Sequence, residues 1–280
     1  MHTILGINGT TGPELAAELR KQNIKVRGVS RRPFPGDWEH RQADVTNLAE
    51  VLDVVDGSSV VYLLVGLEYD IRVWRRDWPV VIENVIQACL NNNAKLVFLD
   101  NVYAYGLVNG PMAENSPIRP NSEKGKVRAR LVQLLFNAAQ NNHLRVCIAR
   151  AADFYGPQCR TSALNATLFE RFAKGSSAFV MGRADKIHTY TYTRDIGPAL
   201  AILGTDDRAE VMKRVAKVAG LHERMWRAAV AGTANDAPLM LVVFPAVNQV
   251  IDLNTAHLAL ARRHWPLAIM VVLLASAALS

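Results

Sequence analysis

Three glycines near the N-terminus have the spacing of a loop that binds a diphosphate. They stand in the run Gly6-Ile7-Asn8-Gly9-Thr10-Thr11-Gly12, after a strand-like segment and before a helical pattern. In such a loop the first glycine permits a tight turn, the second lets the backbone approach a pyrophosphate, and the third lets helix and strand pack closely. The helix N-terminus offers N–H groups and a positive dipole to the phosphates. We therefore predict a dinucleotide-binding loop; an ordinary glycine turn is the alternative.

The end of the second predicted strand indicates which dinucleotide would bind. An NAD site usually carries Asp or Glu there, which binds the 2′-hydroxyl of the ribose. Here the sequence is Ser30-Arg31-Arg32, and a guanidinium binds phosphate with paired hydrogen bonds. The segment therefore favours NADP over NAD, with a solvated basic turn as the alternative. Asp44, after the next short strand, is predicted either to accept from the adenine amino group or to cap the following helix.

Alternating strand-like and helix-like segments must position this loop. Short apolar runs are typical of a parallel sheet buried on both faces, and they occur at 3–7, 24–29, 60–65, 95–99 and 145–149. Helical patterns with apolar residues on one side lie between them, at 14–21, 81–90 and 126–140. This alternation predicts an α/β fold of the Rossmann type, a doubly wound parallel sheet with right-handed crossovers.

The composition fits a globular protein of one or two domains. Of the 280 residues, 50% are hydrophobic and 20% are charged, which excludes a disordered chain, and 17 Gly and 12 Pro are too few for a fibrous one. Three cysteines without a paired spacing suggest neither a disulfide framework nor a zinc site. We therefore expect no metal and a cytoplasmic location. The net charge is +7, but no long run of Lys and Arg favours nucleic acid.

The last third of the chain does not follow the alternating pattern. We predict a cofactor-binding domain over 1–155, rejoined by 188–204, and a smaller, diverged substrate region over 156–280. The apolar tail 266–280 has 15 residues and no charge, whereas a membrane-spanning helix needs about 20 apolar residues. We expect a buried terminal helix or a hydrophobic partner surface, and a membrane contact through 265–280 is the alternative left open.

With these motifs the chain resembles the extended short-chain dehydrogenase/reductases, in the NAD-dependent epimerase/dehydratase family. The glycine spacing is that family's form of the loop, and similar segments follow in order over about residues 1–204. Asp100-Asn-Val-Tyr-Ala-Tyr-Gly106 resembles the family's Ser-Ser-x-x-Val-Tyr-Gly segment, and the run from Arg150 to Pro157 resembles its substrate-side Tyr-Gly-Pro motif. The resemblance implies that Val45, Val65 and Gly66 lie at the cofactor, and that the substrate contacts Tyr103, Tyr105, Arg150, Asp153, Phe154 and Tyr155.

The sequence departs from this family at the residues that catalyse its reactions. The family uses a Tyr-x-x-x-Lys pair on one helix, in which the tyrosine is the general acid/base, together with a Ser or Thr. Here Lys124 stands at the tyrosine position, Arg128 at the lysine position and Asn101 at the serine position. Arg128 can bind ribose or phosphate, Asn101 can donate to a developing oxyanion, and Lys124 can transfer a proton if its surroundings favour the neutral amine. A solvated basic helix face, or a site without catalysis, is the alternative.

The resemblance implies an NAD(P)-binding oxidoreductase, or a sugar-nucleotide epimerase or dehydratase-like protein, that acts by hydride transfer on a small hydroxyl or carbonyl substrate. Because the tyrosine is missing, a non-catalytic sensor or regulatory protein that binds NADP(H) is the alternative. A small molecule is the expected partner, and a homodimer is an open expectation. The sequence does not identify the substrate.

Overall fold

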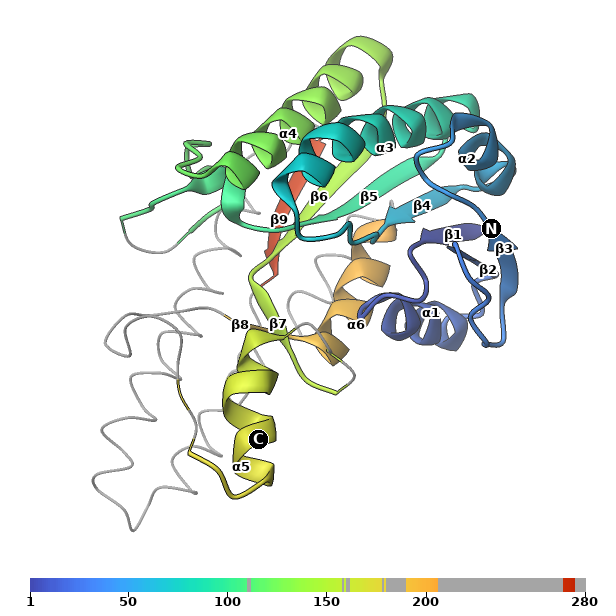
Figure 1. Ribbon diagram of the computed structural model, residues 1–280. Coiled ribbons are helices and arrows are strands. Elements are labelled where there is room, and N and C mark those ends of the chain that lie inside the picture. Colours follow the sequence, from blue (N-terminus) through green and yellow to red (C-terminus); the bar gives the residue numbers. More distant parts are fainter. Residues whose placement is uncertain are drawn as a thin grey trace, which may run out of the picture.

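Among the residues that the structure describes, seven strands form one parallel sheet in the order β3-β2-β1-β4-β5-β6-β9 (Figure 1). The computed structural model describes residues 1–109, 112–157, 159, 162–177, 179 and 190–205, and the backbone of 269–274. The strands are β1 (His2–Leu5), β2 (Val26–Ser30), β3 (Glu39–Gln42), β4 (Val60–Leu63), β5 (Lys95–Asp100), β6 (Val146–Ala151) and β9 (Ile269–Leu274). The strand order reverses between β1 and β4, and open α/β sheets bind ligands at such a reversal, beyond the carboxyl ends of the strands.

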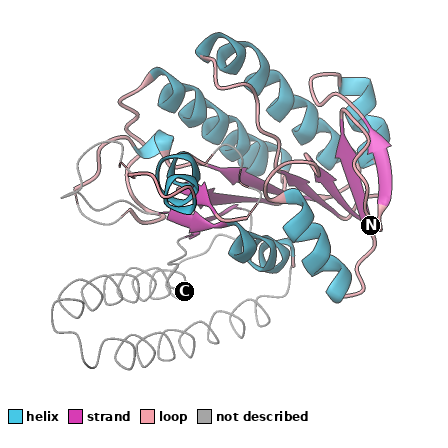
Figure 2. Cartoon of the chain, turned by 60° about the horizontal axis from the view of Figure 1, so that its bottom comes forward, coloured by secondary structure: helices cyan, strands magenta, loops and turns pink. Residues whose placement is uncertain are grey.

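Helices cover both faces of this sheet, and Figure 2 shows the same layers from a second direction. One face carries α2 (Leu48–Val55), α3 (Ile71–Asn91) and α4 (Glu123–Asn142), and the other carries α1 (Gly12–Lys21) and α6 (Thr193–Gly204). Each face has its own apolar core, one with Val54, Ile82 and Leu135, the other with Leu15 and Leu200. This arrangement confirms the predicted Rossmann-type fold, a doubly wound parallel sheet.

The three predicted helices are present, and each begins earlier than its apolar pattern suggests; α1 begins at Gly12 rather than at Glu14. α4 begins at Glu123 because the Ser122 hydroxyl accepts a hydrogen bond from the backbone N–H of Gly125, at 3.1 Å. α3 begins at Ile71, where the Asp70 carboxylate accepts from the N–H of Arg72 at 2.7 Å. Such caps satisfy N–H groups that the first helical turn leaves free. The polar residues of these first turns therefore belong to the helices, although the apolar pattern used to predict the helices does not include them.

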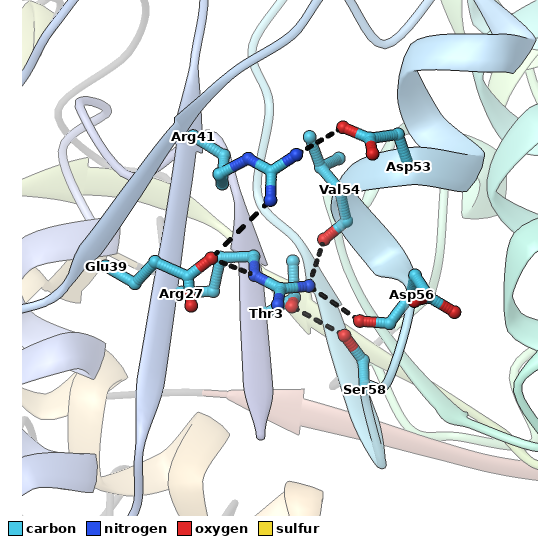
Figure 3. A network of polar contacts seen from close by, with 8 residues as sticks. All are labelled: Thr3, Arg27, Glu39, Arg41, Asp53, Val54, Asp56 and Ser58. Carbon is cyan, nitrogen blue, oxygen red and sulfur yellow. Dashed lines mark hydrogen bonds and ion pairs between the residues drawn. The ribbon is translucent and has the colours of Figure 1, made fainter.

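Arg27 connects the edge strand β3 to the end of α2 through hydrogen bonds (Figure 3). Its guanidinium donates to Glu39 on β3 at 2.9 Å, and to the carbonyls of Val54 and Asp56 at the end of α2, at 2.9 and 2.7 Å. A cation at a helix C-terminus is favoured because the last carbonyls have no partner within the helix. Arg41 on β3 also pairs with Glu39. These contacts fix the edge of the sheet next to the turn that carries Arg31.

The predicted apolar tail contains a strand. β9 pairs in parallel with β6, from Val146 opposite Ile269 to Ala151 opposite Leu274. The expectation of a terminal helix is therefore wrong for 269–274, and an edge of the main sheet accounts for that apolar run. No helix among the described residues is long and apolar enough to cross a membrane. The rest of 265–280 lies outside the described residues.

A second, smaller sheet lies beside the main one. β7 (Asp153–Tyr155) and β8 (Tyr190–Tyr192) pair in parallel, and a helical segment follows β7. That segment is π-helical over Asn165–Phe169 and continues as α5 (Glu170–Ala173). The division of the chain at 155 and 156 stays a prediction, since β9 comes from the predicted C-terminal region and pairs within the main sheet.

Candidate functional site

A cleft of about 1260 Å³ lies at the carboxyl ends of the parallel strands, where their order reverses. Sixteen of the predicted site residues line it: Gly6, Asn8, Gly9, Thr10, Thr11, Ser30, Arg31, Asp44, Val45, Val65, Gly66, Asn101, Tyr103, Arg128, Asp153 and Phe154. Six predicted residues do not line it: Gly12, Arg32, Tyr105, Lys124, Arg150 and Tyr155. Segments that are far apart in the sequence thus meet at one cleft.

The glycine loop has the geometry of a phosphate cradle. Gly6 has φ +96°, and a Cβ there would lie 2.9 Å from the backbone nitrogen of Val65, so a side chain is excluded. A Cβ on Gly12 would lie 2.4 Å from the carbonyl oxygen of Ile7. The absence of a side chain therefore lets α1 pack closely on the loop, although Gly12 itself does not line the cleft. Thr11 precedes α1 and makes no side-chain hydrogen bond to its first turn. The N–H groups of this turn are therefore left for an anion.

The turn after β2 is held by its own hydrogen bonds. The Ser30 hydroxyl donates to the carbonyl of Arg32 at 2.6 Å and lies 3.1 Å from Nε2 of His40. Gln42 donates to the carbonyl of Arg31 at 2.8 Å. Ser30 thus shapes the turn, and Arg31 is the arginine of this turn that lines the cleft. Arg31 forms no ion pair with any residue that the structure describes.

Asp44 does not cap α2, which corrects one of its two predicted roles. Its carboxylate accepts from the N–H and the hydroxyl of Thr46, at 2.9 and 2.8 Å, while the cap of α2 is Asn47. Asp44 lines the cleft, and its contact with adenine stays a prediction. The neighbouring backbone is held by Asn84 of α3, a buried side chain that donates to the carbonyl of Val45 at 3.1 Å. Sequence reasoning missed this contact because nothing local links the two residues.

A buried charge cluster supports the floor of the cleft. The Asp100 carboxylate lies 3.4 Å from the guanidinium nitrogens of both Arg128 and Arg150, and all three side chains are buried. Burial raises the pKa of Asp100, and the two arginines act against that shift. The Arg128 guanidinium also stacks on Trp78, 4.0 Å from the ring centre, which fixes it in place. Arg150 lies 4.5 Å from the ring centre of Tyr105, so this pair supports the cleft from behind.

Two of the three predicted catalytic residues line the cleft. Asn101 accepts a hydrogen bond from the backbone N–H of Tyr103 at 3.0 Å, which leaves its amide N–H₂ as a donor. Arg128 lies beside it on the cleft wall. Lys124 lines a smaller neighbouring hollow of about 500 Å³. The Lys124 ammonium donates to the backbone carbonyl of Tyr69 at 3.1 Å and lies 2.9 Å from the centre of the Tyr69 aromatic ring.

Tyr69 is a site residue that sequence reasoning missed. It lines both hollows, and its hydroxyl lies 3.2 Å from the hydroxyl of Tyr103. It stands in the loop between β4 and α3, where no motif marks it. The only sequence signal that could have indicated Tyr69 is the nearby segment Val65-Gly66-Leu67. This segment places the loop at the carboxyl end of a central strand.

Of the substrate-binding residues predicted in the run from Arg150 to Pro157, Asp153 and Phe154 of β7 line the cleft. The next residue, Tyr155, is buried in a group of aromatic rings and packs on Tyr192 with 5.4 Å between ring centres. Burial raises its pKa to about 12. The described residues contain no cluster of His, Cys, Asp and Glu that could hold a metal ion.

Comparisons with known proteins identify a matching family and a set of similar solved structures. The NAD dependent epimerase/dehydratase family matches residues 2–219. Among solved structures, MoeE5 in complex with UDP-glucose and NAD is 25% identical, with a TM-score of 0.61 over 73% of this chain and 71% of that chain. UDP-N-acetylglucosamine 4-epimerase from Bacillus cereus is 17% identical, with a TM-score of 0.64 over 72% and 70%. UDP-glucuronic acid 4-epimerase from Bacillus cereus, in complex with NAD, is 20% identical, with a TM-score of 0.63 over 74% and 75%. No curated protein sequence matches. The last two structures show the fold alone.

Proposed function

The chain belongs to the NAD-dependent epimerase/dehydratase family, and we propose that it binds a nicotinamide dinucleotide in the large cleft and acts by hydride transfer. The observation that carries this proposal is the glycine loop, which ends at the uncapped N-terminus of α1 and lines the cleft at the reversal of strand order. The neighbour with 25% identity was solved with NAD and a sugar nucleotide, which supports the same class of cofactor here.

The pyrophosphate, the adenine and the ribose of a dinucleotide each have a matching group among the residues that line the cleft. The loop from Gly6 to Thr11 would hold the pyrophosphate, and Asp44 would accept from the adenine amino group. Arg128 would donate to ribose hydroxyls, and Asn101 would donate to the reacting oxygen of the substrate. When bound, the cofactor supplies or accepts the hydride, while the chain positions the substrate and excludes water.

The charge on the cleft wall supports NADP as the preferred cofactor. The turn 30–32 has no carboxylate to bind a ribose 2′-hydroxyl, and Arg31 lies on the wall without an ion-pair partner among the described residues. A 2′-phosphate would satisfy that guanidinium. MoeE5 and UDP-glucuronic acid 4-epimerase from Bacillus cereus were both solved in complex with NAD, which makes NAD the alternative for this chain.

The substrate class that the proposal assigns is a sugar nucleotide or a similar hydroxyl or carbonyl compound. The test incubates the protein and either NADP⁺ or NAD⁺ with UDP-glucose, UDP-glucuronic acid and dTDP-glucose, and follows reduced nicotinamide and new sugar products. Conversion of one compound is the expected result. Cofactor binding without conversion of any of them would reject this substrate class and favour the alternative, a non-catalytic dinucleotide-binding protein.

A further inference from the structure

We propose that Tyr103 is the general acid/base of this site, and that Tyr69 connects it to solvent. This inference rests on the proposed function, because it assigns the proton transfer that accompanies hydride transfer. Tyr103 is the first residue of a short 3₁₀ turn (Tyr103–Tyr105) directly after β5. It lines the cleft together with Asn101 and Arg128, the residues expected at the reacting oxygen and the ribose.

The catalytic lysine and arginine predicted from the sequence, and the other tyrosines near the site, do not fit this role. The Lys124 ammonium is occupied by the carbonyl and the ring of Tyr69 and does not line the main cleft. The guanidinium of Arg128 cannot give up a proton in this pH range. Tyr105 and Tyr155 are buried and line neither hollow. Among the described tyrosines, only Tyr69 and Tyr103 have access to the cleft.

Aromatic packing holds the two phenols in place. The ring of Tyr103 stacks on Trp74 at 6.3 Å and 21°, and Tyr69 meets the same ring edge-on at 5.6 Å. Trp74 belongs to α3 and is buried, so both phenols pack on a fixed element. Lys124 binds the backbone of Tyr69 and is therefore a positioning residue for the pair.

The pair can move a proton between the cleft and water. The hydroxyls lie 3.2 Å apart, and the Tyr69 residue is 66% exposed. Burial, followed by the hydrogen bond to Tyr69, raises the pKa of Tyr103, so its phenol is neutral and able to donate at physiological pH.

During reduction of a carbonyl, the hydride adds to the carbon and the C=O π pair moves to oxygen. The Tyr103 O–H bond breaks as a new O–H bond forms on the substrate, which becomes an alcohol. Tyr69 then gives its proton to the Tyr103 oxygen and takes one from water. The cofactor is oxidised and the substrate reduced; oxidation of an alcohol runs the same steps backwards.

The experiment follows the tyrosine side chains by NMR, with ¹³C at Cζ, in the full chain. Tyr103→Phe and Tyr69→Phe assign the two resonances, and Tyr62, which is buried on β4, is the control. Saturation with NADP⁺ or NAD⁺ should move the Tyr103 resonance, because a cationic nicotinamide bound beside the phenol changes its electrostatic surroundings. The Tyr62 resonance should not respond.

Cofactor binding that leaves the Tyr103 resonance unmoved would overturn this inference while the proposed function stands. If neither NADP⁺ nor NAD⁺ binds, both this inference and the proposed function are overturned. If the substrate panel gives turnover, Tyr103→Phe should lower it by about 10²- to 10⁴-fold with unchanged cofactor affinity. Full turnover by that variant would also reject the assignment.

Discussion

The hydroxyls of Tyr69 and Tyr103 lie 3.2 Å apart, although 34 residues separate them in the chain. They meet because β4 and β5 are neighbours in the sheet and both loops leave at the carboxyl end. Tyr69 lies beyond β4, and Tyr103 lies beyond β5. The family's usual tyrosine would come from the helix that carries Lys124, and the Lys124 ammonium lies 2.9 Å from the centre of the Tyr69 ring, so this contact supplies phenols next to that position.

Arg31 should determine the preference between the two dinucleotides. Arg31→Ala is expected to weaken binding of NADPH by about 10- to 100-fold, the loss for one charge-assisted hydrogen bond, and to change NADH binding by less than about twofold. Arg32→Ala is the matched control, since Arg32 does not line the cleft, and its effect should be smaller. Fluorescence titration measures all four affinities. An equal loss for both cofactors would show that Arg31 does not contact the 2′-phosphate.

Gly12 should be needed for packing between α1 and the glycine loop. Gly12→Ala places a Cβ 2.4 Å from the carbonyl oxygen of Ile7, and such overpacking costs about 1–3 kcal/mol of unfolding free energy. Gly66→Ala is the control, because a Cβ there meets no atom within 4 Å. Urea unfolding compares the two variants. Equal stability of both would contradict the close approach at Gly12.

Loss of Asp100 should destabilise the fold, because its two arginine partners would stay buried. Asp100→Ala leaves Arg128 and Arg150 buried without their carboxylate, and loss of one partner from a buried pair costs about 3–5 kcal/mol. Asp53→Ala removes an exposed partner of Arg41 and should cost at most about 1 kcal/mol. Chemical denaturation at neutral pH measures both. Similar costs for the two variants would refute the role given to Asp100.

His2 should make stability depend on pH in the acid range. Burial, followed by the nearby α-amino group, lowers its pKa from 6.5 to about 4. The unfolded chain therefore binds more protons between these values, so stability is complete above about pH 6.5 and falls as the pH drops towards 4. His2→Gln should flatten this part of the curve, as measured by unfolding at several pH values. An unchanged slope would show that other groups cause it.

The glycine loop and the strand–helix alternation could be predicted because their signals are local. Gly6, Gly9 and Gly12 follow one strand directly, and each apolar run is short enough to identify from its own residues. β9 could not be predicted, since an apolar run of this length suits a strand or a buried helix equally well. Its partner β6 decides the outcome, and β6 lies more than a hundred residues earlier in the chain.

The residues predicted to bind the cofactor were easier to place than the predicted catalytic residues, because their sequence signals are local. The loop and the turn at Ser30 lie at the ends of adjacent strands and follow a fixed plan. The contacts of Lys124 with Tyr69, and of Asp100 with Arg128 and Arg150, join distant segments through side chains. Alignment by motif placed Lys124 in the catalytic position, whereas the structure shows its ammonium bound to the Tyr69 backbone.

The most direct test of the proposed dinucleotide site is titration of the purified protein with NADPH and NADH, followed by fluorescence of the reduced nicotinamide. We expect saturable binding of both at one site, with NADPH bound more tightly. If neither compound binds, the glycine loop and the cleft do not form a dinucleotide site.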